Sequence, residues 1–172
     1  MNSISARDLT RLGLFGSAAL VLFVFESLVP RPLPWMKLGL GNLAVLLALM
    51  VYGFLAALGV SAIKLLVGGL ISGSLGGPAF VIAGGAGMAS LAVMAGVFKS
   101  KPELFSPVGL SALGALIHQS VQLLLAYLYI GHASLFLLLP IFLATGLSSG
   151  ILIGLLVYWT LGKLRANGWL EQ

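Results

Sequence analysis

The sequence predicts an all-α polytopic membrane protein with six transmembrane helices in one bundle, and three observations support this fold class. The chain has 172 residues, of which 60% are hydrophobic and only 8% are charged, whereas ordinary soluble domains carry about 25% charged residues. Its mean hydropathy is +1.14. Its long apolar runs are separated by short stretches rich in proline, glycine or charge. A soluble domain of this size would lack the polar surface to cover such a core.

Each predicted span is an apolar run bounded by helix-breaking or charged residues. A transmembrane helix needs about 20 apolar residues, and the second run falls short of this length. The prolines of 30–34 end the first run, and Gly53 alone separates the second from the third. The sixth run is too long for one span, so Pro140 should either kink it or separate a short interfacial turn from the helix proper. The predicted spans of this single domain (residues 1–172) are 9–29, 38–52, 54–75, 79–98, 107–130 and 135–164.

The basic residues predict which way the spans run. In a six-span protein both termini and the loop after the fourth span lie on one side of the membrane. These three segments hold six of the nine Lys and Arg residues, which are Arg7, Arg11, Lys99, Lys101, Lys163 and Arg165. By the positive-inside rule this side is cytoplasmic. We therefore expect a multi-pass protein of the plasma (inner) membrane with both termini in the cytoplasm.

Composition also argues against several classes of activity. The absence of Cys excludes disulfides, thiolate metal sites and Cys nucleophiles. Only two His residues are present, and no Ser-His-acid set or carboxylate pair is visible, so we expect neither a metal site nor a catalytic residue. The basic residues form no patch of the kind that binds nucleic acid. No GxxxxGK[ST] loop is present, so the chain cannot hydrolyse ATP by itself. The sequence thus predicts a protein that is not an enzyme and carries no cofactor.

Lys64 is the most informative residue, because it is the only charge in the apolar run 54–75. A lone charge at the centre of a bilayer costs about 3 kcal/mol on insertion scales, so such residues usually mark ligand or ion pathways. Glu26 is the only carboxylate near the membrane core, while Arg31 and Lys37 lie in the first external loop. The predicted ligand-binding residues, drawn from the first, second, third and fifth runs and that loop, are Glu26, Arg31, Lys37, Asn42, Lys64, His118, Gln119 and Gln122.

Two readings of Lys64 remain open at this stage. Its ammonium either contacts an anionic group of a ligand or forms a structural ion pair with Glu26. The amide and imidazole groups of the fifth run are equally able to serve as interhelical hydrogen bonds, which contribute about 0.6 kcal/mol each. We favour a site for the group as a whole, because three cations against one local carboxylate suit an anionic ligand.

Glycine and serine mark a second candidate surface, on the first span. Gly13 and Ser17 are four residues apart, and Gly16 lies beside them. Small side chains at this spacing allow another helix to approach closely. We expect the strip Gly13, Gly16 and Ser17 to dock a helix of a partner protein.

Several short motifs resemble those of the Gx transporter family, whose members are often labelled heptaprenyl diphosphate synthase component I. The resemblance covers nearly the whole chain, and its most specific elements are Lys-Leu-Gly-Leu-x-Asn (37–42) and Ser-Pro-x-Gly (106–109). Further elements are Glu-Ser-Leu-Val-Pro (26–30), Gly-Ser-Leu (73–75) and Gly-Ala-Leu-Ile-His (114–118). Two positions depart from the family pattern: Gln119 stands where Asn is usual, and Lys64 where Arg is frequent. Lys is a point charge and Arg a bidentate fork, so the ligand is expected to differ in detail.

The resemblance implies a similarity to the substrate-binding (S) subunits of energy-coupling factor transporters, which are six-helix membrane proteins with an outward-facing pocket. It implies a transmembrane coupling protein with ATPase subunits as partners, besides the lipid bilayer and a small-molecule ligand. The expected ligand is a small anionic metabolite, either vitamin-like, phosphorylated or an isoprenoid diphosphate.

Two other functions stay open. The first is a non-catalytic membrane subunit that anchors or regulates a prenyl diphosphate synthase. Chain elongation itself is tied to Asp-rich motifs that hold Mg²⁺, and Asp8 is the single Asp of the chain. The second is a self-sufficient channel or secondary transporter, against which the lack of a visible inverted repeat argues.

Overall fold

The computed structural model describes residues 6–28, 39–100 and 105–168, and every regular element in these ranges is helical. Six α-helices follow one another, with one short 3-10 helix before the last. Their bounds are α1 Ala6–Leu28, α2 Leu40–Tyr52, α3 Phe54–Ile71, α4 Pro78–Ser100, α5 Pro107–Ile130, η1 Ala133–Leu138 and α6 Leu139–Ala166.

The helix bounds agree closely with the predicted runs. α5 has the predicted limits, and α2 begins two residues later than expected. α3 ends at Ile71 instead of residue 75, because the chain turns over Gly73, which has a φ of 66°. Pro140 lies in the first turn of α6, after η1. The long sixth run is thus divided into a short turn and a helix, which is the second of the two arrangements expected there.

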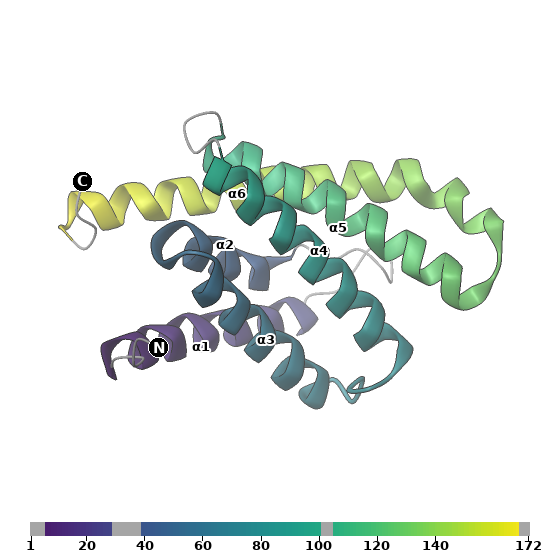
Figure 1. The fold of residues 1–172 in the computed structure, drawn as a ribbon, viewed down its shortest axis with the longest axis horizontal. Helices are drawn as coiled ribbons and strands as arrows, with labels where there is room; N and C mark the ends of the chain where they lie inside the picture. The colour runs from purple at the N-terminus through teal and green to yellow at the C-terminus, as the bar shows by residue number, and fades with distance from the viewer. Residues whose placement is uncertain (1–5, 29–38, 101–104, 169–172) are drawn as a thin grey trace.

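The helices form two groups of three. α1, α2 and α3 all pack against one another, whereas α5 packs against both α4 and α6. Contacts of α2 with α6 and of α3 with α4 join the two groups. The start of α1 and the ends of α4 and α6 lie toward the same end of the bundle, at the left in Figure 1. We call this end the N/C end.

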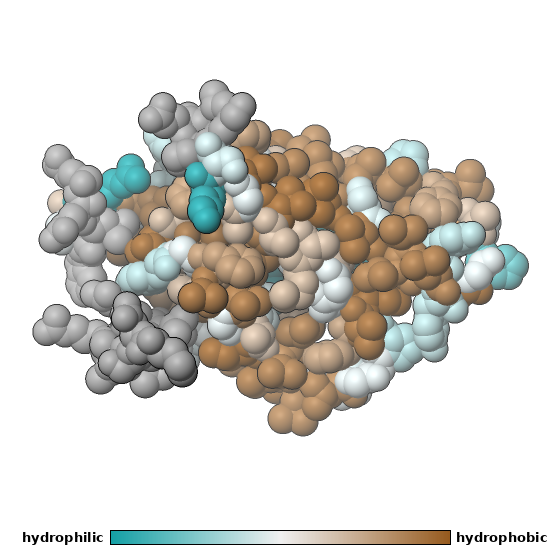
Figure 2. Space-filling view, viewed as in Figure 1, coloured by the Kyte–Doolittle hydropathy of each residue, from teal (hydrophilic) through white to brown (hydrophobic). Residues whose placement is uncertain are grey.

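Apolar side chains cover the outside of the bundle as well as its core. Large hydrophobic side chains are exposed on all six helices, including Leu14, Leu55 and Leu128. Figure 2 shows hydrophobic residues over the middle of one face, with the strongest hydrophilic colours toward the two ends. Four helical stretches are long and apolar enough to cross a membrane, namely Phe54–Ile71, Pro78–Ser100, Pro107–Ile130 and Ala133–Ala166, and Gly13–Glu26 and Leu40–Tyr52 are shorter apolar helices.

A row of glycines brings α5 and α6 into close contact. Gly146, Gly150 and Gly154 recur every fourth residue of α6, and all three are buried. A Cβ atom on Gly154 would lie 2.4 Å from the Cα of Val108, and one on Gly150 would lie 2.8 Å from the Cβ of Ala115. The two backbones therefore meet where any larger side chain would separate them.

Hydroxyl groups within these helices bind the helices' own backbones. Ser120 donates to the carbonyl of Leu116 at 2.9 Å, and Thr160 donates to that of Leu156 at 2.7 Å. Ser90 instead reaches across from α4 to the carbonyl of Gly114 on α5, at 2.7 Å. Such bonds satisfy polar groups without water, which suits helices in an apolar environment.

Candidate functional site

The candidate site is built around the N-terminus of α2, which Glu26 of α1 holds. Glu26 is only 6% exposed. Its Oε1 accepts a hydrogen bond from the backbone N–H of Gly39 at 2.7 Å, and its Oε2 accepts one from that of Leu40 at 2.9 Å. A carboxylate at this position also interacts favourably with the positive end of the helix dipole. Glu26 therefore ties the end of α1 to the start of α2.

In the first turn of α2, Asn42 meets Lys64 of α3. The ammonium of Lys64 donates a hydrogen bond to Oδ1 of Asn42. Asn42 is exposed and Lys64 half-buried, so the pair lies at the edge of the three-helix group. The aliphatic stem of Lys64 packs over Gly41, where a Cβ atom would lie 3.0 Å from the lysine Cδ and 3.2 Å from the carbonyl oxygen of Ala19. Glycine at position 41 thus lets α1, α2 and the lysine stem meet.

The chain geometry explains why these two residues are level with each other. They are 22 residues apart, with Gly53, the turn between α2 and α3, midway between them. At 1.5 Å per residue both lie about 15 Å along their helices from this turn. α2 has 13 residues and is about 20 Å long, shorter than the roughly 30 Å hydrocarbon core of a bilayer. The start of α2 is also recessed relative to the right-hand ends of α5 and α6 (Figure 1).

The other predicted ligand-binding residues fall into two sets. Arg31 and Lys37 lie outside the described residues. His118, Gln119 and Gln122 are half-buried on α5, which packs against α4 and α6. Gln119 packs on α6, because a Cβ atom on Gly146 would lie 2.6 Å from its Cγ. The structure thus brings Glu26, Asn42 and Lys64 together, and a role of the α5 residues in the same site stays a prediction.

α6 is the helix of the second group that packs most closely against α2 within the described ranges. It places Ser149 beside the start of α2: a Cβ atom on Gly39 would lie 3.6 Å from the Ser149 Oγ. Ser149 was not among the predicted site residues. The sequence feature that points to it is the Ser148-Ser149 pair in the middle of a largely apolar run.

The small residues of α1 do not share one face. Gly16 is buried, and a Cβ atom on it would lie 3.1 Å from Cδ1 of Ile63 on α3. Gly13 and Ser17 are exposed, and nothing lies within 4 Å of a Cβ atom placed on Gly13. Gly16 therefore serves packing inside the chain, whereas Gly13 and Ser17 belong to an exposed face of α1 that continues through Leu14, Val21 and Phe25.

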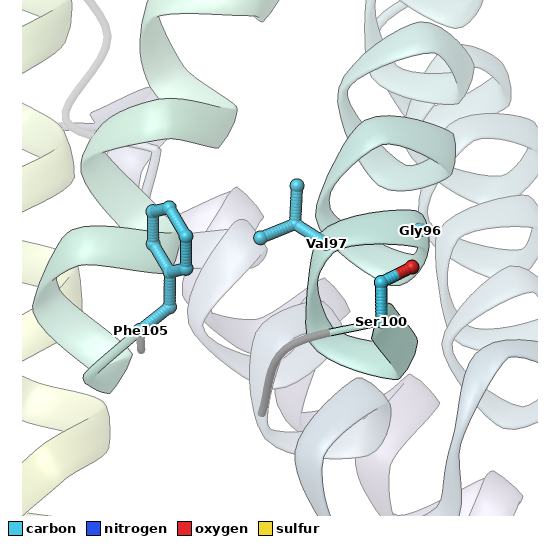
Figure 3. Close-up of a pocket in the computed structure, with 4 residues that line it drawn as sticks. All are labelled: Gly96, Val97, Ser100 and Phe105. Carbon is cyan, nitrogen blue, oxygen red and sulfur yellow. The ribbon is translucent and has the colours of Figure 1, made fainter. Parts of the chain in front are cut away.

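A hollow of about 300 Å³ lies near the N/C end of the bundle, apart from the cluster of Glu26, Asn42 and Lys64. Figure 3 shows its lining: Gly96, Val97 and Ser100 from the end of α4, and Phe105 just before α5. Among the described residues, the side chains that line it include no ionisable group that would recognise a charged ligand. In the described parts of the chain no three His, Cys, Asp or Glu residues gather as metal ligands.

The fold defines an all-helical protein whose longest helices have the length and composition of membrane spans. The chain belongs to the heptaprenyl diphosphate synthase component I family, whose model matches residues 15–159. This match covers the three residues of the cluster and bears out the family resemblance seen in the motifs. No curated protein and no solved structure matched the chain.

Proposed function

We propose that this protein is an integral membrane protein of six spans that binds a small anionic metabolite from the outer side of the plasma membrane and works with an external energising module. The observation that carries the proposal is the Lys64–Asn42 pair at the recessed start of α2. An ammonium and an amide held at one point are suited to bind a carboxylate or phosphate. Lys64 lies within the apolar helix α3, and if this helix spans the membrane a charge without function there would be costly.

The arrangement of helices supports this topology. The start of α1 and the ends of α4 and α6 lie at the N/C end (Figure 1). Lys99 lies in the last turn of α4, and Lys163 and Arg165 in the last turn of α6. The N/C end is then cytoplasmic by the positive-inside rule. The start of α2, which carries Asn42, lies away from this end and so toward the outer side.

The exposed face of α1 supports a partner within the membrane. Gly13 and Ser17 present almost no side chain at the cytoplasmic half of this helix, so a second helix can approach it closely. We assign the docking of a transmembrane coupling protein, which would connect the chain to ATPase subunits, to this face. We therefore propose transport of the energy-coupling factor type, with a small anionic metabolite as the substrate class.

The test is native mass spectrometry of the full-length protein purified in lipid nanodiscs. We expect a bound small anion in the wild-type protein and its loss in Lys64→Met. Inorganic diphosphate and farnesyl diphosphate, added separately, distinguish recognition of the anionic group alone from recognition of an isoprenoid tail. A wild-type protein with no bound species, and no binding of either probe or of vitamin-like carboxylates, would contradict the proposal.

The family name favours a second candidate, a non-catalytic membrane subunit that anchors or regulates a prenyl diphosphate synthase. Affinity capture of the full-length chain from its own membranes separates the two. Recovery of a soluble prenyl synthase as a stoichiometric partner supports the second candidate, whereas recovery of ATPase subunits with a membrane coupling protein supports the first.

A further inference from the structure

Glu26 is the most buried ionisable side chain for which the structure describes partners, and both of its oxygens are used on another helix. It extends from the last turn of α1 to the backbone N–H groups of Gly39 and Leu40, at 2.7 and 2.9 Å. These bonds are bidentate and charge-assisted, and hydrogen bonds of this kind are about twice as strong as those between neutral groups. Two such bonds fix the position of the start of α2 relative to α1, because both carboxylate oxygens have to stay aligned with two consecutive backbone amides.

The first amides of α2 need this partner. The N-terminal N–H groups of a helix have no acceptor within the helix, and at membrane depth water is not present to replace one. The N–H of Asn42 binds the carbonyl of Gly39 at 2.7 Å. Glu26 accepts from the N–H groups of Gly39 and Leu40. The N-cap residue, Gly39, has no side chain that could accept these hydrogen bonds.

The hydrogen bonds from Gly39 and Leu40 to Glu26 fix the residue at which α2 begins, and therefore the direction in which Asn42 points. Gly39 has a φ of 73°, in the left-handed region, and the helix starts directly after it. Asn42 follows in the first turn and meets Lys64 there. A start of α2 shifted by one residue would rotate Asn42 by about 100° around the helix and away from α3.

We propose that Glu26 is a positioning residue that does not contact the ligand: it clamps the N-terminus of α2 and thereby holds Asn42 against Lys64 in the binding geometry. The part that concerns the ligand rests on the proposed function. The clamp itself does not, and it is measured without any ligand.

The first test is amide hydrogen exchange at single residues in the purified full-length protein in nanodiscs. We expect Glu26→Ala to speed exchange at Gly39 and Leu40 by roughly tenfold to a hundredfold, as the loss of a charge-assisted hydrogen bond predicts. Glu26→Gln keeps one carbonyl acceptor and should fall between. Glu26→Asp keeps the charge and both oxygens but is one methylene shorter, so it should also give only part of the wild-type protection. Gly87→Ala on α4, with nothing within 4 Å of its Cβ, is the control and should leave both amides unchanged.

The second test follows the site through the reactivity of the Lys64 amine toward a small acylating reagent, mapped by mass spectrometry. Releasing Asn42 should raise the labelling of Lys64 several-fold in Glu26→Ala. Gly39→Ala separates the clamp from a direct effect of the carboxylate, because it strains the left-handed start of α2 and brings a Cβ to 3.3 Å from the Asn42 Nδ2 while Glu26 stays in place. We expect Gly39→Ala to raise the labelling as well.

Two results would overturn the inference. One is wild-type exchange at Gly39 and Leu40 in folded Glu26→Ala. The other is raised Lys64 labelling in Glu26→Ala but not in Gly39→Ala, which would make Glu26 a direct partner of Lys64. If Glu26→Ala does not fold, Glu26→Gln and Gly39→Ala give the same two readouts. If the Lys64→Met variant disproved the anion-binding proposal, these measurements would still test the clamp, because they use no ligand.

Discussion

Asn42 and Lys64 are joined by a hydrogen bond across two helices that a single glycine turn connects. With Gly53 midway between them, the antiparallel pairing of α2 and α3 places the two side chains at the same depth. The pair combines a cation with an amide, and the amide is exposed. This geometry makes Lys64 the residue whose replacement tests the function most directly.

Lys64→Met should weaken anion binding by roughly tenfold to a hundredfold while the protein stays folded. A charge-assisted hydrogen bond contributes about 1.5–3 kcal/mol, and Met retains most of the aliphatic stem that packs over Gly41. The measurement is titration of the purified variant with the anion that the wild-type protein binds in native mass spectrometry. Lys64→Arg, which keeps the charge, is the matched control and should retain part of the affinity.

The same variant decides between the two readings of Lys64. If the lysine serves only to neutralise Glu26, Lys64→Met should be unstable and Glu26→Gln should rescue it, since removing one partner of a buried pair leaves a charge uncompensated whereas removing both can be nearly neutral. Unchanged affinity in a stable Lys64→Met protein would end the anionic-site proposal.

The proposed topology predicts opposite labelling of two serines. Ser100 ends α4, and Ser134 lies in η1, before α6; both are exposed. Because the chain has no Cys, Ser100→Cys and Ser134→Cys give single, unambiguous sites. In intact cells a membrane-impermeant maleimide should label position 134 and should reach position 100 only after the membrane is opened. Labelling of position 100 from outside would reverse or break the six-span arrangement.

Most of the helical elements could be predicted, because hydropathy and helix breakers are local properties of the sequence. The runs ended by prolines and glycines were placed to within a few residues, and the break at Pro140 was foreseen as one of two outcomes. The pairing of helices could not be read in this way. It depends on which small residues face each other, and the close contact along Gly146, Gly150 and Gly154 was not among the small-residue pairs predicted from the sequence.

The site shows the same limit. Charge and the cost of burying it selected Glu26, Asn42 and Lys64 from the sequence. In the structure Asn42 and Lys64 meet, and Glu26 binds the backbone at the start of the helix that carries Asn42. The partners of Glu26 are backbone amides, which no sequence pattern displays. Ser149 was missed because α6 was expected to stand outside the site, and its approach to α2 is a property of the assembled fold.

Because Gly13 and Ser17 lie on the exposed face of α1, we expect substitutions there to affect partner docking without affecting folding. Gly13→Leu and Ser17→Leu should leave the purified protein stable and able to bind its ligand, while uptake in cells is lost because a bulky side chain keeps the partner helix away. The readouts are uptake in cells and capture of the partner from membranes. Uptake at the wild-type level in both variants would mean that this face meets only lipid.

Gly16→Leu is the contrasting variant on the same helix. Its side chain would enter the contact with Ile63, where a Cβ atom alone comes within 3.1 Å. We expect loss of stability of about 1–3 kcal/mol, as is typical of overpacking, with reduced amounts of folded protein. A stable Gly16→Leu would contradict the packing of α1 on α3.

The glycine row of α6 gives a prediction that is independent of function. Gly154→Ala should destabilise the protein by about 1–3 kcal/mol or more, because the added Cβ would lie 2.4 Å from a backbone atom, the Cα of Val108, which cannot move aside as a flexible side chain can. Gly162→Ala on the same helix has nothing within 4 Å of the new Cβ, so it should be neutral or stabilising by up to about 1 kcal/mol through helix propensity. Both are measured by thermal unfolding in detergent. Equal stability of the two variants would mean that α5 and α6 do not approach as closely as this structure has them.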